Sequence, residues 1–474
     1  MKLKVLKLIM LLLFLCNCNA QEKVSNLHKE ALTLKVNELV KEYIALDIFS
    51  GVVLIADKGK PLYHKAFGHA NREQNIKNTL QTKFDIGSMN KSFTQLLILK
   101  LIQENKLSLS DKLGDFLKGF PKEAQKITVE NLLNHTSGYG DYWSPGFNDL
   151  PIDKKRLPAL VKRIQKSPLL FSPGTENEYS NSGYILLGAI IEKITNKTYH
   201  QNIEEQIIKP LKLNETYTED KAKVPNRVVG YYKDVKGNLF NNEKFTEVSN
   251  PDGGFYATTL DILKFYREYF YGAKIIKKET KEKLEFFNLI KPHYNSGGAI
   301  PLAGGYNGAN TVHFEILRDK ISIIVFANMD EPVAEQLGKG ILNIVRGKTP
   351  NKPTLPAIQK VYKAYQKQGI EYVKKNFNKL IANFHPSDPK GLILNNIGYT
   401  FLNDNSTEKA IEIFKLNTIL FADDPNVWDS LGEAYLKKGD IKNALLNYKK
   451  ALKIDPNFPS AKKMVLKLKT KNNE

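Results

Sequence analysis

The chain has 474 residues, of which 42% are hydrophobic and 10% aromatic, and this composition excludes a disordered protein. Its length suggests two or three domains, each large enough to bury its own core. The formal net charge is +20 at pH 7, but the lysines are scattered and no basic stripe is interleaved with aromatic residues. The charge pattern therefore argues against nucleic-acid binding.

The N-terminal segment has the pattern of an export signal. A lysine-rich start over residues 2–7 precedes a short apolar core over residues 8–15, and Ala20 is a small residue at a plausible cleavage site. The apolar run is shorter than the roughly 20 residues that a membrane-spanning helix needs. We therefore interpret residues 1–20 as a signal peptide and expect an exported, periplasmic or cell-envelope protein.

Both cysteines of the chain, Cys16 and Cys18, lie inside this segment. Cleavage after Ala20 removes them, and the mature chain then has no thiol and no disulfide. The alternative is a lipoprotein, in which lipid attached to one of these cysteines would tether the chain to a membrane.

Residues 30–348 read as a mixed domain. Alternating apolar runs predict strands at residues 50–56 and 61–68, and again near 311–317 and 321–327. Helices are expected at both ends and in between: residues 31–43, the apolar segment that runs from Ser88 through Ile102, a mostly helical stretch to about residue 271, and residues 333–346. This order predicts an α+β fold, with one antiparallel sheet flanked by helices and accompanied by a helical region.

Beyond a proline-rich linker at residues 349–356, residues 357–474 read as an all-α repeat domain. Three positions recur 34 residues later: Gly398 as Gly432, Ala410 as Ala444, and Phe414 as Tyr448. The period and the small and aromatic positions resemble the tetratricopeptide repeat. Two repeats are recognisable, preceded by a degenerate helical pair from Ile358 to Ala382. Such a domain either binds a protein or peptide partner on its concave face or serves as a packing domain without a ligand, and the sequence leaves both open.

Two short segments supply the parts of a serine acyl-transfer site that needs no histidine. Ser88 and Lys91 are three residues apart at the start of the apolar helix, so the amine can reach the hydroxyl on one face. A serine needs such a base to act as a nucleophile. Farther along, Tyr179 offers a phenol that can relay a proton, and Asn181 a neutral amide that can hold a substrate carbonyl or amide. In the alternative reading, Ser88 caps the helix and Lys91 is a surface residue, but the rest of the helix is too apolar to leave a lysine solvated.

These residues resemble the serine β-lactamase and penicillin-binding superfamily, in particular its class C-like branch of esterases and D-amino-acid peptidases. The resemblance spans residues 39–346 and rests on five segments, residues 87–93, 132–138, 173–174, 179–184 and 251–254, together with Asp261. It implies that Ser88 is acylated and that Lys91 assists proton removal. It further implies that Tyr179 acts as general base and acid and that Asn181 contacts the acyl side chain.

The third motif of that superfamily is altered. The family places Lys-x-Gly or His-x-Gly on the strand that lines the site, and the best match puts Leu302 at the basic position. A shifted match puts Tyr306 there, so neither restores a cation. The backbone amide of Gly305 can still form an oxyanion hole with that of Ser88. Loss of one charged hydrogen bond costs about 1.5–3 kcal/mol, which weakens recognition of a substrate carboxylate and favours neutral esters or amides over anionic β-lactams.

The predicted function is an exported serine hydrolase that cleaves small-molecule or peptide substrates through an acyl-enzyme at Ser88. The alternative, favoured by Leu302, is a low-turnover or non-catalytic ligand-binding homologue that acts with its repeats as a partner-binding module. His135 is assigned a structural role in a wall loop. The remaining histidines lack metal-ligand spacing, so no metal and no cofactor are expected.

Overall fold

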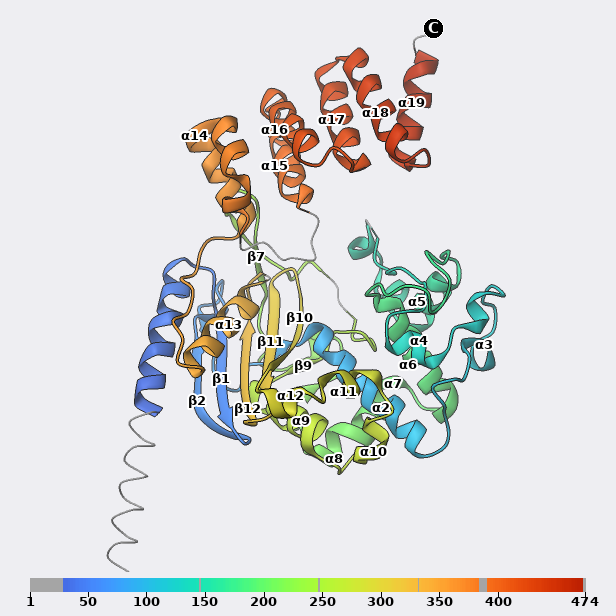
Figure 1. Cartoon of the computed structure of the whole chain (residues 1–474), viewed down its shortest axis with the longest axis vertical. Coiled ribbons are helices and arrows are strands. Elements are labelled where there is room, and N and C mark those ends of the chain that lie inside the picture. Colours follow the sequence, from blue (N-terminus) through green and yellow to red (C-terminus); the bar gives the residue numbers. More distant parts are fainter. Residues whose placement is uncertain (1–28, 145, 246–247, 331, 383–389, 472–474) are drawn as a thin grey trace, which may run out of the picture. The chain divides into compact units, whose positions relative to one another are not determined.

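The computed structural model describes residues 29–471 apart from 145, 246–247, 331 and 383–389. The predicted signal peptide at residues 1–20, with Cys16 and Cys18, lies outside the described residues. The chain forms two compact units (Figure 1). One extends to residue 353 without residues 233–240, and the other comprises residues 233–240 and 354–474. None of the described helices is both long enough and apolar enough to cross a bilayer.

The first unit is built on a five-stranded sheet in which every neighbouring pair is antiparallel. Its order is β10-β11-β12-β1-β2. The strands are β1 (Gly51–Asp57), β2 (Lys60–Phe67), β10 (Ala299–Tyr306), β11 (Ala309–Ile316) and β12 (Ile321–Ala327). Early and late segments of the sequence therefore meet at β1 and β12, where Gly51 lies opposite Ala327. The predicted α+β class with an antiparallel sheet is confirmed.

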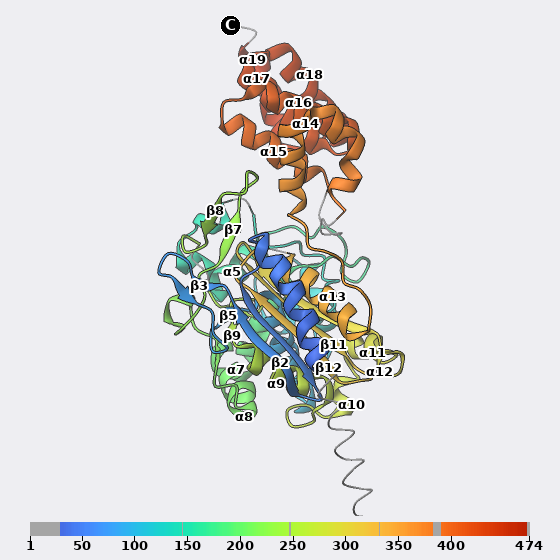
Figure 2. The ribbon, with the colours of Figure 1, turned by 90° about the vertical axis from the view of Figure 1, so that its left-hand side faces the viewer.

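Helices cover both faces of this sheet. Residues 29–45 and α13 (Val333–Val345) lie against one face (Figure 2). On the other face, α2 (Lys91–Gln103) and α9 (Thr259–Tyr271) share a core with apolar residues of β1 and β12. Phe93 of α2 stacks on Phe265 of α9 with ring centroids 3.7 Å apart. Buried on nearly all sides, α2 is held rigidly, which suits a helix that carries site residues.

A helical region packs beside α2, and α6 (Asn181–Thr195) contacts α2 directly. Its other helices are α3 (Leu113–Phe116), α4 (Val129–Leu133), α5 (Leu157–Gln165), α7 (Tyr199–Ile203), a π-helical turn (Glu204–Ile208) and α8 (Lys209–Leu211). Short strands form smaller sheets: β3 (His69–Asn71) with β4 (Ile76–Lys77), β5 (Phe84–Asp85) with β9 (Tyr256–Ala257) and β6 (Thr216–Tyr217), and β7 (Tyr231–Lys233) with β8 (Leu239–Asn241). Between α9 and β10 lie α10 (Lys278–Lys281), α11 (Glu285–Ile290) and α12 (His293–Ser296).

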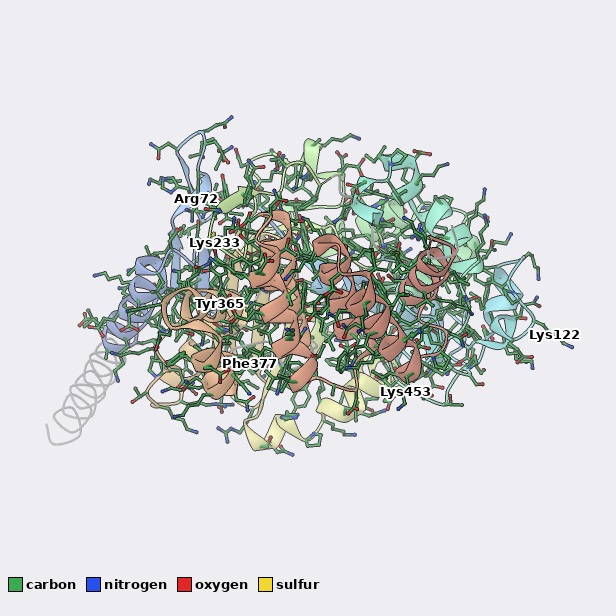
Figure 3. The ribbon with its side chains drawn as sticks, turned by 90° about the horizontal axis from the view of Figure 1, so that it is seen from above. Arg72, Lys122, Lys233, Tyr365, Phe377 and Lys453 are labelled. Atoms are coloured by element: carbon green, nitrogen blue, oxygen red, sulfur yellow. The ribbon has the colours of Figure 1, made fainter. Side chains whose placement is uncertain are left out.

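The second unit is helical. Its helices are α14 (Ala357–Leu380), α15 (Gly391–Asn403), α16 (Thr407–Leu420), α17 (Pro425–Lys438), α18 (Ile441–Ile454) and α19 (Pro459–Lys471). In α14, Gly369 has φ of 75° and breaks the helix into two, as expected for the degenerate pair. Tyr365 and Phe377, on either side of this break, are both buried (Figure 3). Within the same unit, Lys236 of residues 233–240 forms an ion pair of 2.6 Å with Asp404.

The repeat period has a direct packing cause. A Cβ atom on Gly398 would lie 2.4 Å from the ring of Phe414, and one on Gly432 would lie 2.9 Å from the ring of Tyr448. Each glycine thus lets the aromatic residue of the next helix lie against the backbone. The same contact occurs 34 residues apart, as the sequence predicts.

Replacing the buried aromatic residue of one repeat should loosen that repeat. Phe414→Ala removes a side chain with no exposed surface, and we expect a loss of about 3–5 kcal/mol. Native-state hydrogen exchange of α15 and α16 in the full chain measures this loss. Ile419→Ala, on the same helix but 60% exposed, should change it by less than about 0.5 kcal/mol. Equal effects of the two variants would contradict the packing account.

Candidate active site

The predicted nucleophile lies in a tight turn at the entrance to α2. Residues Gly87–Asn90 form a 3-10 turn and the regular helix begins at Lys91, so the helix predicted from Ser88 starts with this tighter turn. Gly87 has φ of 49°, a left-handed conformation that other residues rarely adopt. Its amide donates to Asp85 Oδ1 at 2.7 Å. The turn thereby fixes the backbone on which Ser88 stands.

Strand β10 passes against this turn at van der Waals distance. A Cβ atom on Gly304 would lie 2.2 Å from the carbonyl oxygen of Ile86 and 2.5 Å from the amide nitrogen of Ser88. A Cβ atom on Gly87 would lie 2.5 Å from the amide nitrogen of Gly305. Only glycines permit this approach, which brings the predicted oxyanion residues, Ser88 and Gly305, onto facing segments.

Lys91 contacts three separate segments through one nitrogen. Its Nζ atom lies 2.9 Å from Ser88 Oγ, 2.7 Å from Asn181 Oδ1 and 2.9 Å from the carbonyl oxygen of Asp252. The residue is only 6% exposed. The amide and carbonyl oxygens can only accept hydrogen bonds, so two N–H groups are committed to them. The third position of the nitrogen faces Ser88 Oγ, where a charged amine donates and a neutral amine accepts.

Tyr179 and Asn181 reach the same point from the start of α6. The Tyr179 hydroxyl lies 2.7 Å from Ser88 Oγ, and the residue is 53% exposed. Asn181 is the first residue of α6, which Ser180 caps by accepting from the amide of Ser182. The Ser180 hydroxyl also donates to the carbonyl oxygen of Gly140 at 3.0 Å. The structure thus brings Ser88, Lys91, Tyr179 and Asn181 into one hydrogen-bonded group.

The His135 ring packs against the Tyr179 ring. Its ring lies 4.6 Å from the Tyr179 ring and 5.3 Å from the Tyr184 ring, centroid to centroid. The amide of Ser180 donates to His135 Nδ1 at 3.2 Å, which assigns the ring proton to Nε2. Burial, helped by the charge of Lys91, lowers the pKa of His135 to about 4. A neutral imidazole packed in this way has a structural role, as the sequence suggested.

Two carboxylic acids at the site were not assigned a role from the sequence. Asp141 Oδ2 accepts from Asn181 Nδ2 at 2.7 Å, which orients the asparagine with its oxygen toward Lys91. Asp252 is buried, and burial raises the pKa of its carboxyl group. Its Oδ2 accepts from the Tyr142 hydroxyl at 2.8 Å. Asp141 and Tyr142 lie in a loop without a readable motif. Asp252 lies in the 251–254 segment of the resemblance, but it contacts Lys91 through its backbone carbonyl oxygen, a contact that no side-chain pattern predicts.

The altered third motif adds no positive charge to the site. Leu302 is partly buried and packs against the core of the first unit. Tyr306, at the end of β10, lies near Asn242, with 3.3 Å from its hydroxyl to Asn242 Nδ2. Neither Lys, Arg nor His occurs in the sequence of β10.

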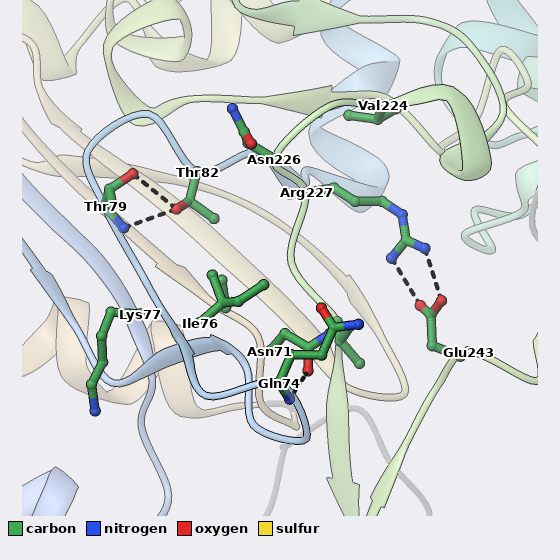
Figure 4. Close-up of a pocket in the computed structure, with 12 residues that line it drawn as sticks. Asn71, Gln74, Ile76, Lys77, Thr79, Thr82, Val224, Asn226, Arg227 and Glu243 are labelled. Atoms are coloured by element: carbon green, nitrogen blue, oxygen red, sulfur yellow. Dashed lines mark hydrogen bonds and ion pairs between the residues drawn. The ribbon is translucent and has the colours of Figure 1, made fainter.

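A separate cavity lies elsewhere in the first unit (Figure 4). It has a volume of about 480 Å³ and includes the paired side chains of Arg227 and Glu243, two of whose contacts measure 2.8 Å. The other lining residues come from β3, β4 and the segments around residues 79–82 and 224–229. None of the five predicted site residues lines it. Within the part of the chain that the structure describes, no cluster of His, Cys, Asp and Glu could hold a metal ion.

Comparison with known proteins agrees with this geometry. The model of the β-lactamase family matches residues 36–338, which is more than half of the chain. The chain belongs to the β-lactamase family. It is a serine hydrolase of this family, and its C-terminal region carries a tetratricopeptide repeat that matches residues 423–461.

Several relatives of this β-lactamase-family chain match about half to two thirds of its length. Penicillin-binding protein 4* of Bacillus subtilis strain 168 is 29% identical over 66% of this chain and 76% of its own length. A teichoic acid D-alanine hydrolase of Staphylococcus aureus is 31% identical over 48% of this chain, which spans only about half (55%) of that relative. A penicillin-binding protein from Bacillus halodurans has the same fold, with a TM-score of 0.56 at 23% identity over 65% of this chain and 99% of its own.

The low pKa of His135 predicts an acid-sensitive fold. The folded-state pKa of about 4 lies below the ordinary histidine value of 6.5, so the unfolded state binds more protons between these values. The associated stability is complete above pH 6.5 and is lost as the pH falls toward 4. In His135→Gln, urea unfolding at pH 7 and pH 4.5 should show a smaller acid loss, by about 1–3 kcal/mol, than in the native chain. Identical acid losses in the two proteins would show that His135 does not titrate as described.

Proposed function

We propose that this chain is an exported serine hydrolase that cleaves ester or amide substrates through an acyl-enzyme on Ser88. The observation that carries the proposal is the convergence on Ser88 Oγ of Lys91 Nζ at 2.9 Å and the Tyr179 hydroxyl at 2.7 Å. These are the distances at which a positioned base can take a proton from a nucleophile. Export rests on the pattern of residues 1–20, with a lipid anchor at Cys16 or Cys18 as its alternative.

In the proposed acylation, Ser88 Oγ attacks the substrate carbonyl carbon and its proton passes to the Tyr179 and Lys91 pair. Tyr179 then protonates the leaving alcohol or amine, whose bond to the carbonyl carbon breaks. A water molecule attacks the acyl-enzyme in the second half, losing a proton to the same pair and releasing the acid. Protons balance over the cycle, because the pair returns a proton to Ser88 Oγ as the bond between Ser88 and the acyl carbon breaks.

The charge that develops on the substrate oxygen is proposed to be held by backbone amides. The amides of Ser88 and Gly305 are the candidates, since Gly304 and Gly87 permit the close approach of their two segments. Such donors are already oriented before the reaction and each contributes several kcal/mol, about 2.7–4, to catalysis. Asn181 is proposed to contact the acyl group.

The substrate class follows from the charges of the site. Without a lysine or histidine at Leu302, the site lacks the cation that would recognise a substrate carboxylate, which favours neutral or positively charged acyl donors over anionic β-lactams. The relative named a teichoic acid D-alanine hydrolase supports a D-aminoacyl ester as one such donor. The repeat domain is proposed to bind a protein or peptide partner. Leu302 also supports the second candidate, a low-turnover ligand-binding homologue.

Covalent labelling separates these two functions. A fluorophosphonate probe should label the native full chain on Ser88 and should not label Ser88→Ala, because only an activated serine attacks phosphorus at a useful rate. Ser110→Ala serves as the control and should label like the native chain. It removes an exposed hydroxyl that is hydrogen-bonded to the Ser108 hydroxyl at 3.0 Å. Equal labelling of all three proteins would remove the catalytic role of Ser88.

The role of the phenol is tested by Tyr179→Phe. This change keeps the ring packed on His135 but removes the proton-relay group, and general acid–base catalysis is worth about 10²–10⁴-fold. The kcat for a neutral ester should fall by that factor. Tyr184→Phe is the matched control, because Tyr184 also packs on His135 but its hydroxyl faces Gln95 and Leu133. A similar fall in both variants would indicate damage to the His135 loop rather than loss of a proton relay.

A further inference from the structure

Asp141 presents a carboxylate that hydrogen bonds through Asn181 and Lys91 link to Ser88 and whose orientation is already fixed. Its Oδ1 accepts from the amide of Trp143 at 3.0 Å, and its Oδ2 accepts from Asn181 Nδ2 at 2.7 Å. Each oxygen of an ionised carboxylate can accept two hydrogen bonds. Asp141 is exposed, and its carboxylate retains acceptor positions beyond these two hydrogen bonds.

Within the described residues, this carboxylate has no ion-pair partner. Among the described residues, no Lys or Arg forms an ion pair with Asp141, whereas Asp220, for example, pairs with Arg156 at 2.8 Å. Lys91, which Asn181 links to Asp141, is buried, and its nitrogen already has hydrogen-bond partners in Ser88, Asn181 and the Asp252 carbonyl oxygen. Asp141 is therefore an exposed anion without an ion-pair partner among the described residues, in a chain whose formal net charge is +20.

The placement of this anion relative to Ser88 is set by a short chain of hydrogen bonds. Lys91 Nζ joins Ser88 Oγ to Asn181 Oδ1, and the other end of the same amide joins Asp141. An acyl group bonded to Ser88 Oγ that extends along Asn181 therefore meets Asp141 next. The sequence of β10, which passes the Ser88 turn, contains no cation.

We propose that Asp141 is a specificity-determining residue that binds the ammonium group of the acyl donor, so that the preferred substrates are esters or amides of amino acids with a free amino group. This inference rests on the proposed function, since it concerns the acyl side of the same site. The ammonium group donates to the open acceptor positions of Asp141, and Asn181 keeps the carboxylate in place. An N-acylated substrate has no charge to offer and loses this contact.

The test compares two substrates on the full chain: alanine methyl ester and N-acetylalanine methyl ester, each in the D and L forms. Near pH 6.5 an α-amino group, with a pKa of about 7.7–8.0, is charged. The readout is the ratio of kcat/KM for the free-amino ester to kcat/KM for the N-acetyl ester. We expect a ratio well above one in the native chain and a decline as the pH rises above about 8.

Asp141→Asn removes the charge and keeps one acceptor oxygen, which can serve either the Trp143 amide or Asn181 Nδ2 but not both. The ratio should fall about ten- to a hundredfold, as expected for one charge-assisted hydrogen bond. Glu178→Gln removes an equal charge one residue before Tyr179 and should change the ratio less than twofold. Asp141→Ala distinguishes ammonium binding from a purely positioning role of Asp141. A positioning role would lower kcat/KM for both esters in proportion and leave the ratio unchanged.

The following outcomes overturn the inference. One is a ratio that Asp141→Asn does not change, and another is an equal fall in Glu178→Gln, which would assign the preference to the general field of the site. A native ratio near one, with the N-acetyl ester still hydrolysed, overturns the inference but leaves the proposed hydrolase intact. Failure of the native chain to hydrolyse either ester, together with absent fluorophosphonate labelling, overturns the proposed function and this inference with it.

Discussion

The site depends on one buried amine. Lys91 Nζ is hydrogen-bonded to a side chain on its own helix, to a side chain on α6 and to a backbone carbonyl of the 250–253 loop. A buried amine without such partners would carry a desolvation cost of several kcal/mol. The arrangement of lowest free energy for Lys91 is therefore the one in which α2, α6 and that loop meet. The same arrangement places Ser88 and Tyr179 in contact, so the polar group that is costly to bury also assembles the chemistry.

Close backbone packing between β10 and the turn that carries Ser88 also shapes the site. Gly87 in a left-handed turn and Gly304 in β10 allow the sheet edge to touch the 3-10 turn that carries Ser88. The contact joins the two halves of the family fold, since the turn leads into a buried helix and β10 belongs to the main sheet. Side chains at these positions would separate the Ser88 and Gly305 amides. In the proposed mechanism, these two backbone amides hold the substrate oxygen.

Much of this arrangement could be predicted from the sequence. The spacing of Ser88 and Lys91 on an apolar helix and the Tyr179 and Asn181 pair indicated the site, because helical periodicity fixes which side chains share a face. The 34-residue recurrence indicated the repeats for a similar reason, since it records a contact between neighbouring helices. The antiparallel sheet followed from strands at both ends of the domain.

Other features depend on tertiary contacts that leave no local signal. Asp141 touches Asn181 only because its loop is anchored on Ser180 through Gly140. Asp252 bonds Lys91 through a carbonyl oxygen, which any residue type could provide. The sequence also does not predict that residues 233–240 belong to the helical unit, because this depends on local packing and on the ion pair between Lys236 and Asp404.

The central claim is that these contacts make Ser88 a nucleophile that forms a covalent acyl-enzyme. Intact-mass spectrometry of the full chain, quenched with acid during turnover of a slowly hydrolysed ester, tests it most directly. The account predicts a mass increase equal to one acyl group, which peptide mapping locates on Ser88 and which disappears as substrate is exhausted. Turnover without any adduct, or an adduct on a different residue, would contradict it.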